Sequence, residues 1–65
     1  MNQYYVPNVF KFLDAQGFTP NDVEDLQYIL DKIYDYECDY GEDFDEDEAI
    51  ALGMEYQKYY RVTHS

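Results

Sequence analysis

Apolar side chains recur every three to four residues through the middle of the chain, and this spacing predicts an amphipathic helix. The residues that keep the spacing are Val23, Leu26, Ile29, Leu30 and Ile33. Thr19 and Pro20 come before them and suit the N-cap and the first helical position, where the missing N–H of proline costs nothing. Asp22 stands three residues after Thr19, as in a capping box. We therefore expect one helix from residue 20 to about residue 38, ending before Gly41.

A second helix is predicted in the C-terminal part of the chain. Asp45 suits its N-cap, Glu48 follows three residues later, and acids in a first turn suit the positive end of the helix dipole. One face then carries apolar residues at helical spacing, namely Ala49, Leu52, Tyr56 and either Tyr59 or Tyr60. Gly53 lies within this helix at a cost of about 1 kcal/mol relative to alanine. We therefore expect another helix to approach closely at Gly53.

The N-terminal part of the chain predicts a shorter helix. Pro7 suits its start and Gly17 suits the position just after its end. The apolar residues between them are Val9, Phe10, Phe12 and Leu13. Residues 3–6 are expected to form an extended arm, because the residue before a proline avoids the helical region. The chain is therefore predicted to be all-α, a small three-helix bundle that forms a single domain over residues 1–65.

Charge adds a prediction about the surface. The 65 residues include fifteen Asp and Glu but only four Lys and Arg, which gives a formal net charge of −11. Solubility of a small domain needs a net charge of only about 2–8 in magnitude, and any excess destabilises the fold through self-repulsion. Direct binding to nucleic acid or to an anionic membrane is not expected, because those surfaces attract Lys and Arg. The expected partner is a cationic protein.

Most of the acidic residues are concentrated in one segment, where nine carboxylates fall within fourteen residues. They are Asp35, Glu37, Asp39, Glu42, Asp43, Asp45, Glu46, Asp47 and Glu48. As a continuous helix this segment would carry roughly one charge per 2.3 Å, against about one per 1.7 Å along duplex DNA. Tyr36 and Tyr40 lie between the acids and are expected to add apolar contacts. We predict that these residues bind the partner, a basic nucleic-acid-binding protein.

In its size, its charge and the segment from Tyr34 to Glu48, the chain resembles short acidic proteins, encoded by phages and mobile elements, that inhibit DNA-binding enzymes. Anti-CRISPR and antirestriction proteins that mimic DNA are examples. The likeness is one of character, since these proteins share no diagnostic motif, and it transfers no functional residues. It implies an inhibitor that occupies the cationic nucleic-acid groove of a host defence, repair or transcription protein.

Three other interpretations stay open at this stage. The acidic segment can be a solvated charged loop that only keeps the protein soluble. The chain can be an adaptor or regulator that binds a protein through a Tyr-rich face formed by Tyr56, Tyr59 and Tyr60. It can also be a Ca²⁺-binding helix–loop–helix, because oxygen ligands fall at the expected positions of an EF-hand loop counted from Asp35. The sixth position of that loop requires glycine and holds Tyr40, so no metal site is predicted.

Catalysis is not expected, and neither is a cofactor. His64 is the only histidine and lies next to the C-terminus, and the acidic neighbours of Cys38 disfavour a reactive thiolate. The sequence has no Gly-rich phosphate loop, no Ser/His/Asp set and no Cys/His metal cluster. We expect a binding protein rather than an enzyme.

The cysteine content, the N-terminal residues and the size of the chain predict its location and its oligomeric state. Cys38 is the single cysteine, which excludes an internal disulfide and fits a reducing compartment. The N-terminus has no basic n-region or apolar h-region of a signal peptide, and no apolar run approaches the ~18 residues of a membrane span. A cytoplasmic location is therefore expected. A homodimer is also possible, because so small a bundle can complete its core by pairing.

Overall fold

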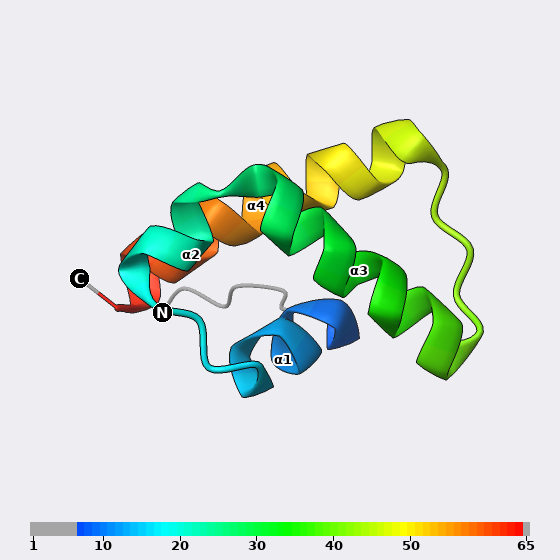
Figure 1. Ribbon diagram of the computed structural model, residues 1–65, viewed down its shortest axis with the longest axis horizontal. Helices are drawn as coiled ribbons and strands as arrows, with labels where there is room; N and C mark the ends of the chain where they lie inside the picture. Colours follow the sequence, from blue (N-terminus) through cyan, green and yellow to red (C-terminus); the bar gives the residue numbers. More distant parts are fainter. Residues whose placement is uncertain (1–6, 65) are drawn as a thin grey trace, which may run out of the picture.

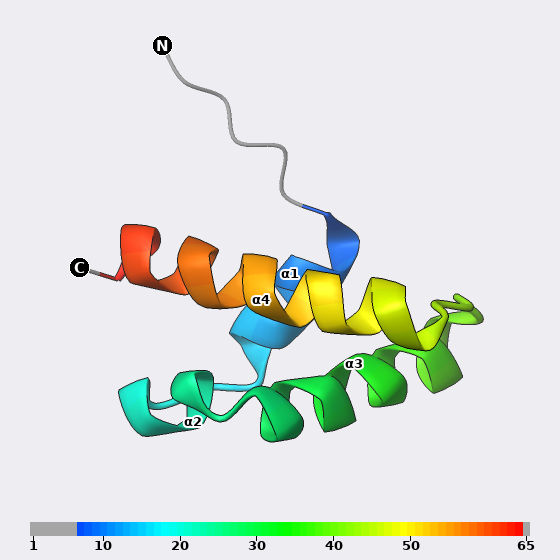
Figure 2. The ribbon, with the colours of Figure 1, turned by 90° about the horizontal axis from the view of Figure 1, so that it is seen from above.

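The computed structural model describes residues 7–64, and within this range the chain forms four helices and no strand. They are α1 (Asn8–Ala15), α2 (Pro20–Glu24), α3 (Leu26–Tyr40) and α4 (Glu46–Thr63). The longest two, α3 and α4, run in opposite directions, and α1 packs beside them (Figures 1 and 2). The all-α bundle predicted from the sequence is confirmed. The extended arm predicted for residues 3–6 lies outside the described residues.

The core is apolar and draws on all four helices. Its members are Val9, Phe10, Leu13, Val23, Ile29, Leu30, Ile33, Tyr36, Ala49 and Tyr56. Ile29 and Ile33 of α3 and Tyr56 of α4 are completely buried, so the apolar faces predicted on the middle and C-terminal helices are confirmed. Burial of each such side chain stabilises the fold by about 1.5–3 kcal/mol.

The predicted caps set the helix boundaries. The backbone N–H of Asp22 donates to Thr19 Oγ1 at 3.1 Å, and the N–H of Thr19 donates back to Asp22 Oδ2 at 3.2 Å, which confirms the capping box of α2. At the start of α4, Asp45 Oδ1 accepts the N–H of Glu48 at 2.8 Å. Gly41 follows α3 with φ of 72°, a left-handed conformation that glycine adopts without a steric cost.

The single helix predicted from residue 20 to about residue 38 is interrupted at Asp25. The backbone of Asp25 leaves the helical region (ψ 95°), and its Oδ1 atom accepts the N–H of Tyr28 at 3.3 Å. Asp25 therefore ends α2 and caps α3, which is why the bundle has four helices rather than three. The apolar spacing continues from Val23 to Leu26 across this break, so the hydrophobic pattern did not predict that the helix is interrupted.

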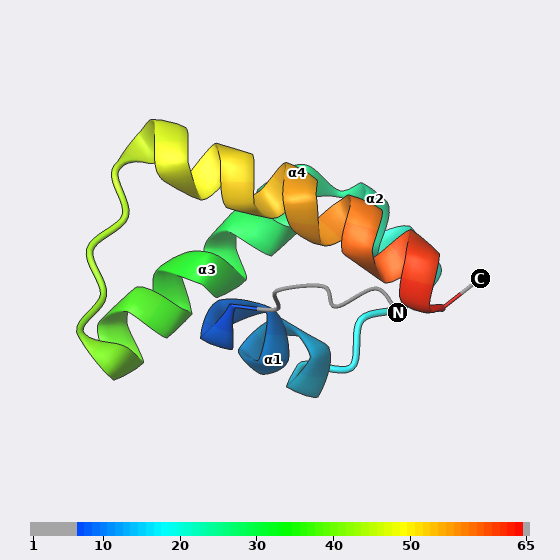
Figure 3. The ribbon, with the colours of Figure 1, turned by 180° about the vertical axis from the view of Figure 1, so that it is seen from behind.

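The close approach expected at Gly53 is confirmed. A Cβ atom added at this position would lie 2.8 Å from Leu26 Cδ1 and 3.6 Å from Leu30 Cδ2. The absence of a side chain at Gly53 therefore lets α4 cross close to the first half of α3. From this crossing the two helices diverge toward the loop of residues 41–45, as Figures 1 and 3 show.

Candidate functional site

The nine carboxylates of residues 35–48 surround one end of the molecule, which we call the acidic end. It comprises the last turns of α3, the loop of residues 41–45 and the first turn of α4 (Figure 1). Because α4 turns back along α3, these charges do not follow one axis. The spacing of roughly one charge per 2.3 Å applies only to a continuous helix, so it does not describe this end, where the acids form a curved surface.

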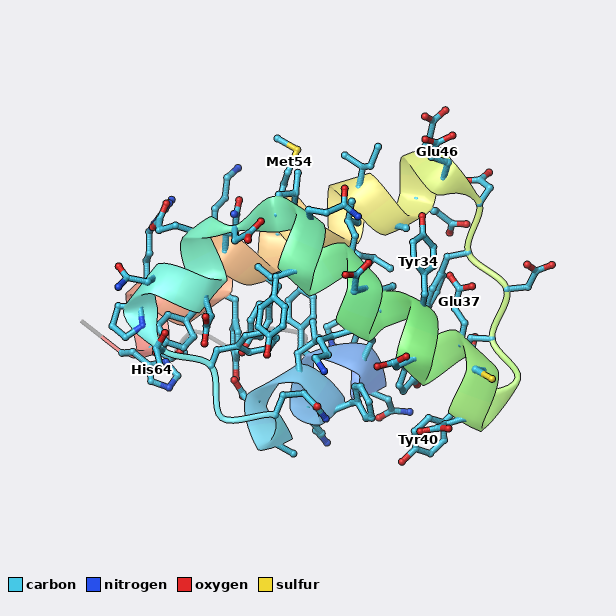
Figure 4. The ribbon with its side chains drawn as sticks, viewed as in Figure 1. Tyr34, Glu37, Tyr40, Glu46, Met54 and His64 are labelled. Atoms are coloured by element: carbon cyan, nitrogen blue, oxygen red, sulfur yellow. The ribbon has the colours of Figure 1, made fainter. Side chains whose placement is uncertain are left out.

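The carboxylates contributed by α3 differ in exposure. Asp35 and Asp39 are exposed and lie one helical turn apart, and Lys32 Nζ approaches Asp35 Oδ2 at 4.0 Å. Glu37 is partly buried and extends toward the space between α3 and the loop (Figure 4). Its Oε2 atom is shielded from solvent and has no hydrogen-bond partner among the described residues. An unsatisfied buried oxygen destabilises a fold, so a hydrogen-bond donor brought by a partner would be favourable at this position.

The loop and α4 contribute the remaining acids. Glu42 and Asp43 are exposed in the loop, and the first turn of α4 exposes Glu46, Asp47 and Glu48. Asp45 is exposed too, although one of its oxygens caps α4. Negative charge in a first helical turn interacts favourably with the helix dipole, typically by about 0.3–1 kcal/mol. This interaction offsets part of the repulsion among the acids.

The two tyrosines predicted to bind the partner are placed differently. Tyr40, the last residue of α3, is 62% exposed. Tyr36 is only 6% exposed and is a core residue, because it continues the buried face of Ile29 and Ile33. Its ring packs against Tyr40 at 4.7 Å between centroids and stacks on Phe44 at 6.4 Å. The buried ring of Tyr36 therefore packs against the exposed ring of Tyr40, and Tyr36 itself has little exposed surface for contact with a partner.

The environment of Tyr36 also affects its ionisation. Burial, followed by the nearby carboxylate of Glu42 and the hydroxyl of Tyr40, raises the pKa of the Tyr36 hydroxyl above its ordinary value. Tyr36 therefore remains protonated at neutral pH and adds no charge to the acidic end.

The acidic end does not form a calcium loop. Asp35, Glu37 and Asp39 belong to α3, and Glu37 projects to the other side of that helix from Asp35 and Asp39. An EF-hand needs such ligands on an irregular loop that wraps the ion. In residues 7–64 no group of three or more His, Cys, Asp or Glu side chains is placed to hold a metal ion. The calcium interpretation fails on this geometry.

The residues considered for catalysis do not meet. Cys38 is exposed on α3 near the acidic end, whereas His64 follows the far end of α4 (Figure 4). The His64 ring stacks on Tyr60 at 3.9 Å between centroids. His64 also borders a groove of about 370 Å³, where Arg61 is paired with Glu24 at 2.7 Å. A nucleophile and a base are therefore not brought together by these residues.

The opposite part of the molecule contains the tyrosine cluster, which consists of Tyr56, Tyr59 and Tyr60 on α4. The hydroxyls of Tyr56 and Tyr59 donate to the two oxygens of Asp14, at 2.8 and 3.0 Å. Tyr60 donates to the carbonyl of Phe18 at 3.3 Å. Burial, then the hydrogen bond to Asp14 and its charge, raise the pKa values of Tyr56 and Tyr59. The cluster fastens α4 to α1 and to the segment after it.

These bonds bear on the adaptor interpretation. Tyr56 is completely buried, and Tyr59 and Tyr60 are partly buried, with their hydroxyls committed within the chain. The face proposed for an adaptor is therefore largely an internal surface.

Comparison with known proteins finds no match for this chain among protein-family models, curated proteins or solved structures. Within residues 7–64, the helices also fall short of the length and apolar character needed to cross a membrane.

Proposed function

We propose that the chain is a binding protein whose acidic end occupies the cationic, nucleic-acid-binding groove of a host enzyme and inhibits it. A CRISPR effector, a restriction enzyme or a repair protein has such a groove. One observation carries the proposal: nine carboxylates gather at one end, and among the cationic side chains of residues 7–64 only Lys32 forms an ion pair with one of them, at 4.0 Å from Asp35. In the described residues, the acids at this end stabilise the fold only locally, through the cap formed by Asp45, the pair of Asp35 with Lys32 and the helix dipole of α4.

The mechanism is competition for Lys and Arg side chains that otherwise contact phosphates. Carboxylates at helix ends and in a short loop are held on a folded scaffold, so less side-chain and backbone freedom is lost on binding than from a disordered acidic tail. The long-range field of a chain with net charge −11 also accelerates its encounter with a cationic groove. Such binding is expected to weaken steeply as salt is added.

The test compares two variants with the same net charge. Asp43→Asn, Glu46→Gln and Asp47→Asn together neutralise the acidic end. The matched control neutralises three acids elsewhere, with Asp25→Asn, Asp31→Asn and Glu55→Gln; asparagine still caps α3 at position 25. Each variant changes the net charge from −11 by three charges, to −8. Only the position of the remaining charge differs.

Each protein is immobilised and incubated with nuclease-treated lysate of the host cells, and duplex DNA is then added to displace what is bound. We expect DNA to release nucleic-acid-binding proteins from the wild type and from the control variant. The acidic-end variant should capture at least about tenfold less, which corresponds to about 1.4 kcal/mol. Equal losses in both variants would show that only net charge matters. Captured proteins that DNA fails to displace would contradict competition for the groove.

A further inference from the structure

Exposed apolar side chains lie along the line where α3 meets α4, next to the acidic end. Tyr34 on α3 is 42% exposed and Met54 on α4 is 51% exposed, with Ile50 partly buried. Figure 4 shows Tyr34 extending from α3 toward the first turns of α4, and Met54 on the outer side of α4. We call Tyr34, Ile50 and Met54 the seam patch.

Helix geometry places these three side chains together. Gly53 of α4 faces Leu30 of α3, and the two helices run in opposite directions. One turn along α3 from Leu30 is Tyr34, and about one turn back along α4 from Gly53 is Ile50, so both residues lie on the side of the crossing that leads to the acidic end. Met54 follows Ile50 by four residues and therefore shares its side of α4.

The seam patch leads directly into the acidic end. Glu46 precedes Ile50 by four residues on the same side of α4, and Glu37 follows Tyr34 by three residues on α3. A ligand lying along the seam would therefore meet apolar side chains first and carboxylates next. The buried, unpaired Oε2 atom of Glu37 is one of the acceptors at that end.

Charge decides which ligand fits this surface. A second copy of the chain would bring another net charge of −11 against the acidic end, and that repulsion opposes self-association. Lys and Arg side chains would instead pair with the carboxylates, while neighbouring apolar side chains cover the seam patch. A third helix can pack across two antiparallel helices by setting its side chains between theirs.

We infer that the seam patch binds a basic amphipathic helix of the partner. Its apolar side chains pack on Tyr34, Ile50 and Met54, and its Lys and Arg side chains reach Glu46 and Glu37. This inference rests on the proposed function, because it names the part of the cationic partner that lies beside the acidic end. DNA offers no comparable apolar helix face, so the seam patch gives the chain a means to select one basic protein among many.

The experiment uses two synthetic peptides as probes, each of about 18 residues, or roughly five helical turns. One is an amphipathic helix of Leu and Lys; the other has the same number of Lys residues, with Ser replacing Leu. Affinities are measured by isothermal titration calorimetry at low and high salt. The chain variants are Tyr34→Gln and Met54→Gln, and Tyr28→Gln serves as the control, since Tyr28 lies roughly 120° away from Tyr34 around α3.

We expect the wild type to bind the Leu–Lys peptide about tenfold more tightly than the Ser–Lys peptide. Tyr34→Gln and Met54→Gln should each remove most of that preference, whereas Tyr28→Gln should retain it. Circular dichroism verifies that every variant is folded. The variants sit on exposed positions, so loss of the fold is not expected to obscure the result.

The possible failures are distinguishable. If both seam variants keep the wild-type preference while the acidic-end variant loses both peptides, the seam inference is wrong and the proposed function stands. If the acidic-end variant binds both peptides as the wild type does, and salt has no effect, the proposed function is wrong. If sedimentation shows a dimer that Met54→Gln abolishes, the seam patch binds a second copy instead of a partner helix.

Discussion

The acidic end and the tyrosine cluster use their carboxylates in opposite ways. Asp14 in the tyrosine cluster accepts hydrogen bonds from two hydroxyls, contributed by Tyr56 and Tyr59 more than forty residues away along the chain. At the acidic end, the hydrogen bond to a carboxylate is local, from the backbone of Glu48 to its own cap, Asp45. The same chemical group therefore joins distant segments in one region and faces solvent in the other.

The different use of carboxylates assigns stability to the tyrosine cluster, and it is consistent with the binding role proposed for the acidic end. A chain of this size has little stability to spare, and the tyrosine cluster together with the core supplies it. The acidic end adds repulsion and few contacts, so the fold does not explain its composition, and this supports the binding role proposed for it. Three predictions test this division of roles.

The largest effect is expected from Tyr56→Ala, which removes a completely buried ring and its bond to Asp14. Truncation of a buried aromatic side chain lowers the free energy of unfolding by about 3–5 kcal/mol. Tyr40→Ala at the acidic end removes a mostly exposed ring and should cost less than about 1 kcal/mol. Urea denaturation followed by circular dichroism measures both. Similar losses in the two variants would contradict the comparison.

The next effect is loss of stability at alkaline pH. The pKa values of Tyr36, Tyr56 and Tyr59 are raised in the folded state, while in the unfolded chain these tyrosines ionise near pH 10. The fold then retains protons that the unfolded chain loses. The free energy of unfolding should therefore be insensitive to these groups below about pH 10. Above it, the buried hydroxyl of Tyr56 should lower the free energy of unfolding by up to about 1.4 kcal/mol per pH unit, and Tyr36 and Tyr59 should add to the fall until each reaches its folded-state pKa.

Urea midpoints measured on both sides of that pH test the prediction, with Tyr56→Phe as the comparison. This variant lacks the buried hydroxyl and should show a shallower fall. A spectroscopic titration in which every tyrosine ionises at its ordinary pKa while the chain is still folded would refute the role given to the cluster.

The smallest effect concerns Glu37. Glu37→Gln removes a charge whose Oε2 atom is buried without a partner, so the free energy of unfolding should rise by about 0.5–1 kcal/mol. Asp39→Asn makes the same change of charge at an exposed neighbour and should alter stability by only a few tenths of a kcal/mol. If Glu37 contacts a partner, Glu37→Gln should also weaken capture while it stabilises the fold. A destabilised Glu37→Gln variant would mean that the carboxylate supports the fold.

Much of the fold could be predicted because caps and apolar spacing are local signals. Thr19 and Asp45 marked two helix starts, and Gly53 marked the crossing of α3 and α4. The break at Asp25 was not predicted, because the apolar spacing continues through this residue. Asp25 itself carries a local signal for a helix start, because aspartate is a favoured N-cap residue.

The candidate site was predictable in composition but not in shape. Sequence identifies the nine acids and the loop between the two helices that carry them, but the angle between α3 and α4 decides how these acids surround one end. Tyr36 was assigned to the surface because of its acidic neighbours, although it stands three residues after Ile33 and seven after Ile29, on the same helix face. The seam patch was missed because it depends on which side of α4 lies beside α3.

Gly53 has a consequence for recognition as well as for packing. The two helices meet there and separate toward the loop, so the angle of that crossing sets how far the carboxylates of α4 stand from those of α3. Substitutions at the crossing can therefore alter the match to a partner without touching any acid. Partner preference can in this way change through a residue that never contacts the partner.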